Sequence, residues 1–226
     1  MPILFISLNE RFCEKIREHG EFEAKVMKIQ DYIPNHERKT YYVSPANTLC
    51  FMDGGMDYSL SRIVFPGIEP HVKNAVRELG HQSIVGKYYL PIGSSLIMDG
   101  SDNKYLVVSP TMLLPQNVSG TRNAYYATMA TLYNILVYHG EKLENVDILL
   151  TSFCCGYGKM DEETSVQQIM EGIRDYTNYK SRSIRKKLPG NIVNNLVFNE
   201  PNLLEQPKYY QNTEWFSIPP EDIVFC

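Results

Sequence analysis

An asparagine and an aspartate ten residues apart, Asn47 and Asp57, flank a turn that contains the glycine pair Gly54-Gly55. A short β-type run at 41–43 precedes this stretch, and a helix-like segment at 58–64 follows it. A strand, a glycine turn and a helix in succession direct backbone N–H groups toward an anion. The stretch therefore predicts an anion site with an amide and a carboxylate beside it. A local role fits too, in which Asn47 ties down its own loop and Asp57 caps the helix.

A second glycine-containing turn follows a predicted strand and reads Ser152-Phe153-Cys154-Cys155-Gly156-Tyr157-Gly158. By itself it indicates phosphate binding only weakly, because it lacks the Lys-Ser/Thr ending of a nucleoside triphosphate loop. The adjacent thiols suggest a nucleophile, but a catalytic cysteine needs a nearby base, and the sequence ties none of the five histidines to this turn. Packing is the favoured role of both cysteines. The ring of Tyr157 fits a sugar contact and a packing role equally well.

Two further features carry charge. Asp31 comes just after a predicted strand, and on sequence grounds alone a lone aspartate there most often forms a turn or a cap. The run at 180–187 contains five basic residues and is interpreted as a solvated helix end or loop. A phosphate-contacting patch is the alternative for this run.

Composition limits the classes of function. The chain has 226 residues, a net charge of −4 and 43% apolar residues, which is ordinary for a globular protein and provides no basic field for nucleic acid. Its five cysteines are odd in number and lack Cys-x-x-Cys spacing, which argues against a disulfide framework and a zinc site. No apolar run reaches the ~18 residues of a membrane span, and no signal peptide is indicated. An intracellular location, cytoplasmic or nuclear, is expected, with no membrane partner.

Hydrophobic periodicity predicts strands alternating with helices, and this predicts a three-layer α/β/α sandwich with a central sheet. Ligands of such sheets bind at the carboxyl ends of the strands, so both glycine turns are expected to line one cleft. The domain is expected to span 1–188, with 189–226 as an extension packed on it. The expected strands are 3–8, 22–29, 41–43, 94–98, 105–108 and 147–150, and the expected helices are 10–19, 58–64, 70–79, 123–138 and 161–179.

The order of these pieces resembles the macro domain family from about residue 22 to residue 179. Four segments match in sequence and in order, and their joint spacing is far more specific than any one of them. The segments are Lys28-Ile-Gln-Asp31-Tyr-Ile, Ser44-Pro-Ala-Asn47, Gly54-Gly55-Met-Asp57 and Ser152 to Gly158; Leu90-Pro-Ile-Gly93-Ser also fits the family pattern.

This resemblance implies an ADP-ribose site with a central mixed sheet behind it. The carboxylate of Asp31 would hold the adenine amine, both turns would give backbone N–H groups to the diphosphate, and Asn47 and Asp57 would face the distal ribose as catalytic residues. No metal or cofactor is implied. The implied ligand-binding residues are Asp31, Tyr32, Asn47, Gly54, Gly55, Asp57, Ser152, Phe153, Cys154, Cys155, Gly156, Tyr157 and Gly158.

Three functions remain open on the sequence. The first is hydrolysis at C1″ of an ADP-ribose derivative, either ADP-ribosylated protein or ADP-ribose 1″-phosphate. The second is a reader module that binds ADP-ribose without turnover. The third is a scaffolding protein whose cleft no longer accepts the family ligand.

The chain departs from the family pattern in both turns. The first has Phe51-Met52-Asp53 where many members have further glycines, and the second has Ser152 and Cys154 where close relatives often have glycine. Because residues with a Cβ resist positive φ, these turns are expected to be tighter and less permissive.

Overall fold

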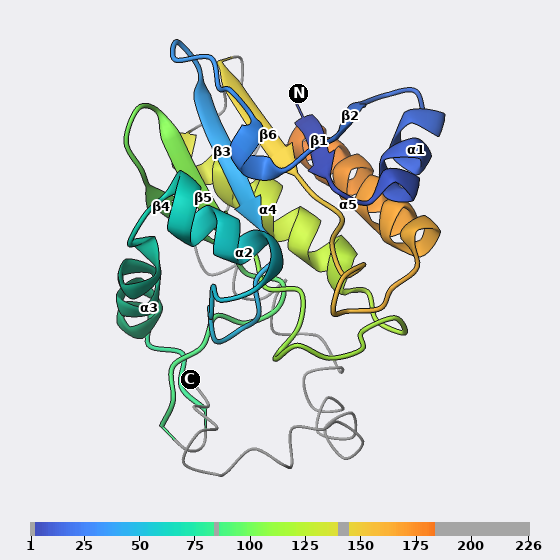
Figure 1. Ribbon diagram of the computed structural model, residues 1–226. Coiled ribbons are helices and arrows are strands. Elements are labelled where there is room, and N and C mark those ends of the chain that lie inside the picture. Colours follow the sequence, from blue (N-terminus) through green and yellow to red (C-terminus); the bar gives the residue numbers. More distant parts are fainter. Residues whose placement is uncertain (1–2, 84–85, 140–144, 184–226) are drawn as a thin grey trace.

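Six strands form one mixed sheet in the order β2-β1-β6-β3-β5-β4 (Figure 1). The computed structural model describes residues 3–83, 86–139 and 145–183, so the expected extension at 189–226 lies outside the described residues. Neighbouring strands are parallel except β4 and β5, which form an antiparallel hairpin. The strands are β1 (Ile3–Ser7), β2 (Glu23–Val26), β3 (Lys39–Ser44), β4 (Leu96–Asp99), β5 (Lys104–Val108) and β6 (Val146–Leu150).

Helices cover both faces of this sheet, which confirms the predicted three-layer α/β architecture (Figure 1). Side chains alternate along a strand. On β3, Tyr41 and Val43 therefore pack on the face covered by α1 (Glu10–Glu18), α4 (Asn123–His139) and α5 (Glu162–Ser183). Tyr42 packs on the opposite face, against the layer that contains α2 (Gly55–Ser59), η2 (Leu60–Val64) and α3 (Ile68–Leu79). In the described part of the chain, no helix is both long and apolar enough to cross a membrane.

Two predicted elements differ from the structure. The strand expected at 22–29 ends at Val26, and the chain then forms a short 3₁₀-helix, η1 (Ile29–Asp31), with the Ile29 side chain buried. The helix expected at 58–64 begins earlier, at Gly55, and continues after α2 as the π-helix η2. In η2 the N–H of Phe65 bonds the carbonyl of Leu60 at 2.8 Å. Such wide turns often accompany functional sites.

Candidate functional site

A cavity of about 780 Å³ opens at the carboxyl ends of the parallel strands, within the size range of small-molecule sites. Its walls come from the segments that follow β1, β2, β3, β5 and β6. The two predicted turns face each other there, because a Cβ on Gly54 would lie 4.0 Å from the ring of Tyr157. Residues lining the cavity are Ser7–Asn9, Met27–Gln30, Pro45, Asn47, Phe51, Asp53–Asp57, Ser59, Thr111, Met112, Pro115, Thr151, Ser152 and Cys154–Tyr157.

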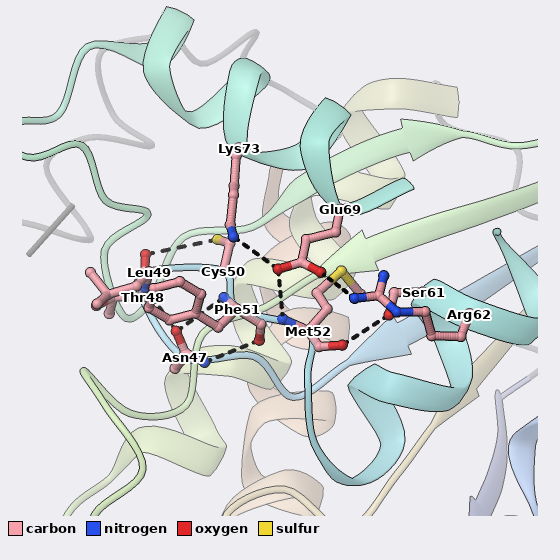
Figure 2. Close-up of polar contacts among 10 residues, drawn as sticks. All are labelled: Asn47, Thr48, Leu49, Cys50, Phe51, Met52, Ser61, Arg62, Glu69 and Lys73. Atoms are coloured by element: carbon pink, nitrogen blue, oxygen red, sulfur yellow. Dashed lines mark hydrogen bonds and ion pairs between the residues drawn. The ribbon is translucent and has the colours of Figure 1, made fainter. Parts of the chain in front are cut away.

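Asn47 lines the cavity and also ties its own loop together (Figure 2). Its side-chain oxygen accepts the N–H groups of Leu49 at 3.0 Å and Phe51 at 3.4 Å. Its amide nitrogen donates to the carbonyl of Phe51 at 3.2 Å, and the residue is 8% exposed. These contacts use the oxygen and one amide hydrogen, which leaves the second hydrogen for a ligand. The local role and the ligand role of Asn47 are therefore compatible.

Asp57 lies in the first turn of α2, while the N-cap of that helix is Gly54. The alternative that Asp57 is the capping residue is therefore wrong. The Ser44 hydroxyl, at the end of β3, donates a hydrogen bond to Asp57 Oδ1. Burial raises the pKa of Asp57 to about 7, the Ser44 hydrogen bond opposes the rise, and the nearby carboxylates of Asp53 and Glu69 add to it. Asp57 as a whole is half-buried, and it lines the cavity. A carboxyl group with this pKa is suited to general base catalysis near neutral pH.

The second turn is held to neighbouring strands and helices. Ser152 shares a hydrogen bond of 2.9 Å with Ser7, whose hydroxyl also accepts the N–H of Asn9 at 3.1 Å. Behind the turn, Ser165 of α5 donates to the carbonyl of Phe153 at 2.6 Å. Phe153 itself is fully buried in the core, so it supports the turn from behind. Tyr157 is 69% exposed and lines the cavity.

The two cysteines of this turn have raised thiol pKa values. Burial raises the pKa of Cys155 to about 11 and also raises the pKa of Cys154. Because a thiolate is the nucleophilic form, these groups stay protonated and unreactive near neutral pH. The packing role expected from the sequence agrees with this environment.

Cys154 adopts φ +65°, a left-handed conformation that favours glycine, at a position where the sequence departs from the family pattern. Such a conformation costs a residue with a Cβ about 1–2 kcal/mol. We expect Cys154→Gly to be as stable as Cys154→Ala or more stable, by up to about 1 kcal/mol in the free energy of unfolding. Cys13, buried in helix α1, is the control: there glycine should be about 1 kcal/mol less stable than alanine. Urea unfolding of the four variants measures whether glycine or alanine is more stable at each of the two positions. If alanine is the more stable residue at both positions, the prediction is contradicted.

Gly158 closes the second turn at a close backbone approach. A Cβ there would meet the Cys154 carbonyl oxygen at 2.3 Å and a Val118 methyl at 2.8 Å. Gly158→Ala should therefore cost about 1–3 kcal/mol of the free energy of unfolding. Gly156→Ala is the matched control, since a Cβ at Gly156 has no neighbour within 4 Å. Urea denaturation measures both, and equal stabilities would show that Gly158 is not required by packing.

Four residues implied by the resemblance lie outside the cavity lining: Asp31, Tyr32, Phe153 and Gly158. Asp31 is exposed at the end of η1, whereas Tyr32 packs edge-on against Tyr42 of β3 with ring centroids 6.4 Å apart. The residues of this region that line the cavity are Met27–Gln30. The role of Asp31 in binding adenine stays a prediction, and Gln30 is the neighbouring polar side chain at the cavity wall.

Sequence reasoning missed the contribution of the first strand. Ser7 is the last residue of β1, Leu8 and Asn9 follow it, and all three line the cavity. The signal that could have found them is their position at the carboxyl end of a parallel strand. Among the described residues, no group of histidine, cysteine, aspartate and glutamate side chains is arranged to hold a metal ion.

Comparison with known proteins gives matches in structure alone. No family model matches the sequence, and no curated protein matches it. The macrodomain of Mycobacterium tuberculosis DarG has a TM-score of 0.47 and 15% identity, over 62% of this chain and 83% of that chain. A mutant of the Oceanobacillus iheyensis macrodomain solved with ADPR has a TM-score of 0.35 and 10% identity, over 67% of this chain and 91% of that chain. Both of these solved structures are macrodomains, the family that the order of the sequence motifs resembles.

Proposed function

We propose that the cavity binds ADP-ribose and that the chain hydrolyses ADP-ribose derivatives at C1″. One observation carries this proposal: Asn47, Asp57 and residues 152 and 154–157 of the second turn line the same cavity, and burial raises the pKa of Asp57 to about 7. The substrate class is a mono-ADP-ribosylated protein or ADP-ribose 1″-phosphate.

Backbone groups carry most of the binding of the diphosphate in this proposal. Lys28 is the one basic residue of the cavity lining, which also contains the acidic side chains of Asp53 and Asp57. Cationic side chains therefore supply little attraction for a dianion. The N–H groups of the two facing turns supply it instead, as such turns do in other anion sites. The exposed Tyr157 ring would cover the ligand from the side of the second turn.

The reaction then follows from the groups at the first turn. The remaining N–H of the Asn47 amide holds a ribose hydroxyl, and the Asp57 carboxylate accepts a proton from the attacking water. The water oxygen forms a bond to C1″ while the bond from C1″ to the leaving oxygen breaks. The leaving group takes the bonding electron pair, and the proton on Asp57 is later passed to solvent or to that group.

A reader function is the second candidate, and a specific observation favours it. Most of the hydrogen-bonding capacity of Asn47 is spent within its own loop, on Leu49 and Phe51. An asparagine with that role stabilises the turn without acting on the sugar.

Two measurements test these functions in order. Calorimetric titration with ADP-ribose should show binding, and no heat at high micromolar ligand would reject both functions. Release of ADP-ribose from a mono-ADP-ribosylated protein, or of phosphate from the 1″-phosphate, should then show turnover. Binding without release of either product would leave the reader function in place of the hydrolase.

A further inference from the structure

A carboxylate on helix α3 contacts the first turn from outside the cavity. Glu69 is 12% exposed in its side chain and pairs with Lys73 at 2.9 Å and with Arg62 at 3.1 Å (Figure 2). The same carboxylate accepts the backbone N–H of Met52 at 3.4 Å. Glu69 does not itself line the cavity, so it would act through the turn and not on a ligand.

The backbone carbonyl of Met52 is held by a second element, the π-helix η2. Ser61, buried in the π-helix η2, donates its hydroxyl to the Met52 carbonyl at 2.9 Å. Both backbone polar groups of Met52 are therefore anchored, one by α3 and one by η2. The segment around Met52 is therefore held in place from outside the cavity.

Met52 connects the anchoring side chains of Glu69 and Ser61 to the loop that holds Asn47. The preceding residue, Phe51, lines the cavity and binds the Asn47 amide through both its N–H and its carbonyl. The Phe51 ring also lies 4.5 Å from the ammonium of Lys73, the same lysine that pairs with Glu69. A displacement of Met52 would thus move the Phe51 backbone and, with it, the Asn47 amide.

The ionised state of Glu69 is secured by its partners. Burial opposes ionisation, but hydrogen bonds and charges from Lys73, Met52 N–H and Arg62 outweigh burial and hold the pKa of Glu69 below its ordinary value. A paired carboxylate in this setting binds a backbone N–H more strongly than a neutral acceptor does.

We propose that Glu69 is a positioning residue that holds the turn at 51–53, and through it Asn47, in the shape required for ligand binding and hydrolysis. The ligand part of this inference rests on the proposed function. The positioning part rests on the contacts of Glu69 and Ser61 with Met52 and is measurable without any ligand.

Glu69→Ala and Glu69→Gln test the proposal against a matched control, Glu171→Gln. Glu171 pairs with Arg122 at 2.9 Å, and neither residue is part of the cavity lining. Glu69→Ala should speed amide hydrogen exchange at 51–53 and weaken ADP-ribose binding or turnover roughly 10–100-fold, because small displacements of a site group are costly. Glu69→Gln retains an acceptor for Met52 and should recover part of the loss. Glu171→Gln should stay within about twofold of the parent protein.

A pH profile adds a readout that a purely structural role would not change. The charge of Glu69 contributes to the raised pKa of Asp57. The other groups that act on Asp57 are Asp53 and the Ser44 hydroxyl. In Glu69→Gln, the rise of activity with pH should therefore move to lower pH, whereas in Glu171→Gln it should stay in place.

The outcomes separate this inference from the proposed function. If the parent protein binds ADP-ribose and Glu69→Ala behaves like Glu171→Gln in exchange, binding and turnover, the inference is overturned. If the parent protein gives no heat with ADP-ribose, the proposed function fails, and hydrogen exchange at 51–53 still decides the positioning role. Should Glu69→Ala fail to fold, Ser61→Ala removes the other anchor of Met52 and should produce the same local increase in exchange. Unchanged exchange in that variant would also overturn the inference.

Discussion

Asp57→Asn is expected to lower the turnover number for hydrolysis by ~10²–10⁴-fold, the contribution that a positioned base makes. Asparagine matches aspartate in size and can still accept the Ser44 hydrogen bond, so the shape of the cavity is retained. The dissociation constant for ADP-ribose should accordingly change by no more than about threefold, since the mutation removes a group used in the transition state. Single-turnover release of ADP-ribose from a modified protein measures the first quantity, and calorimetry measures the second.

Asp53→Asn is the matched control for this experiment. Asp53 lines the same cavity from the same turn, but its side chain is exposed. It should therefore retain most of the turnover. If Asp57→Asn hydrolyses as fast as the parent protein, or if Asp53→Asn loses as much activity as Asp57→Asn, the role given to Asp57 is wrong.

The second large effect is a dependence on pH that has opposite signs for activity and for stability. Because burial raises the pKa of Asp57 to about 7, the base is largely protonated at pH 5 and ionised at pH 8. The turnover number should rise about tenfold per pH unit below this pKa and level off above it. A profile that stays flat from pH 5 to pH 8 would contradict a basic role for this carboxylate.

Stability should change in the opposite direction. The folded-state pKa is raised above the ordinary aspartate pKa of 3.8, so between these two pKa values the folded protein retains a proton that the unfolded chain has lost. This contribution to stability is complete below about pH 4 and is lost as the pH rises through about 7. From pH 5 to pH 8, Asp57 alone should lower the free energy of unfolding by about 2–3 kcal/mol.

Asp57→Asn provides the control, because asparagine does not titrate. Urea unfolding of both proteins at pH 5 and pH 8 isolates the contribution of Asp57 as a difference of differences. The variant should gain stability relative to the parent protein as the pH rises. An equal change in both proteins would show that the pKa of Asp57 is not raised in the folded state.

Much of the fold follows from local patterns. The apolar runs at 94–98 and 105–108, for example, predicted the two strands that the structure has as β4 and β5. The main errors occurred where tertiary contacts override local preference. Ile29 is drawn into the core and ends β2 early, and the helix after Gly54-Gly55 widens into η2, where buried Ser61 bonds the Met52 carbonyl. No local pattern indicates that contact.

The candidate site was likewise predicted from the sequence only in part. Sequence motifs placed Asn47, Asp57 and the turn at 152–157 at the ends of strands, and the structure brings all of them to one cavity. Of the motif around Asp31, residues 28–30 line the cavity, whereas Asp31 itself lies outside the lining. Whether a side chain faces a cavity or solvent depends on the local turn of the backbone, and here that turn is the 3₁₀-helix η1.

The sequence by itself determined the alternation of strands and helices, the two glycine turns and the chemical groups they carry, because these depend on neighbours along the chain. Tertiary structure alone decided the pKa of Asp57, the contribution of Ser7, Leu8 and Asn9, and the anchoring of the first turn by Glu69. Each of these depends on groups far apart in the sequence. Burial and charge act through space, and only the folded arrangement of the strands brings their sources together.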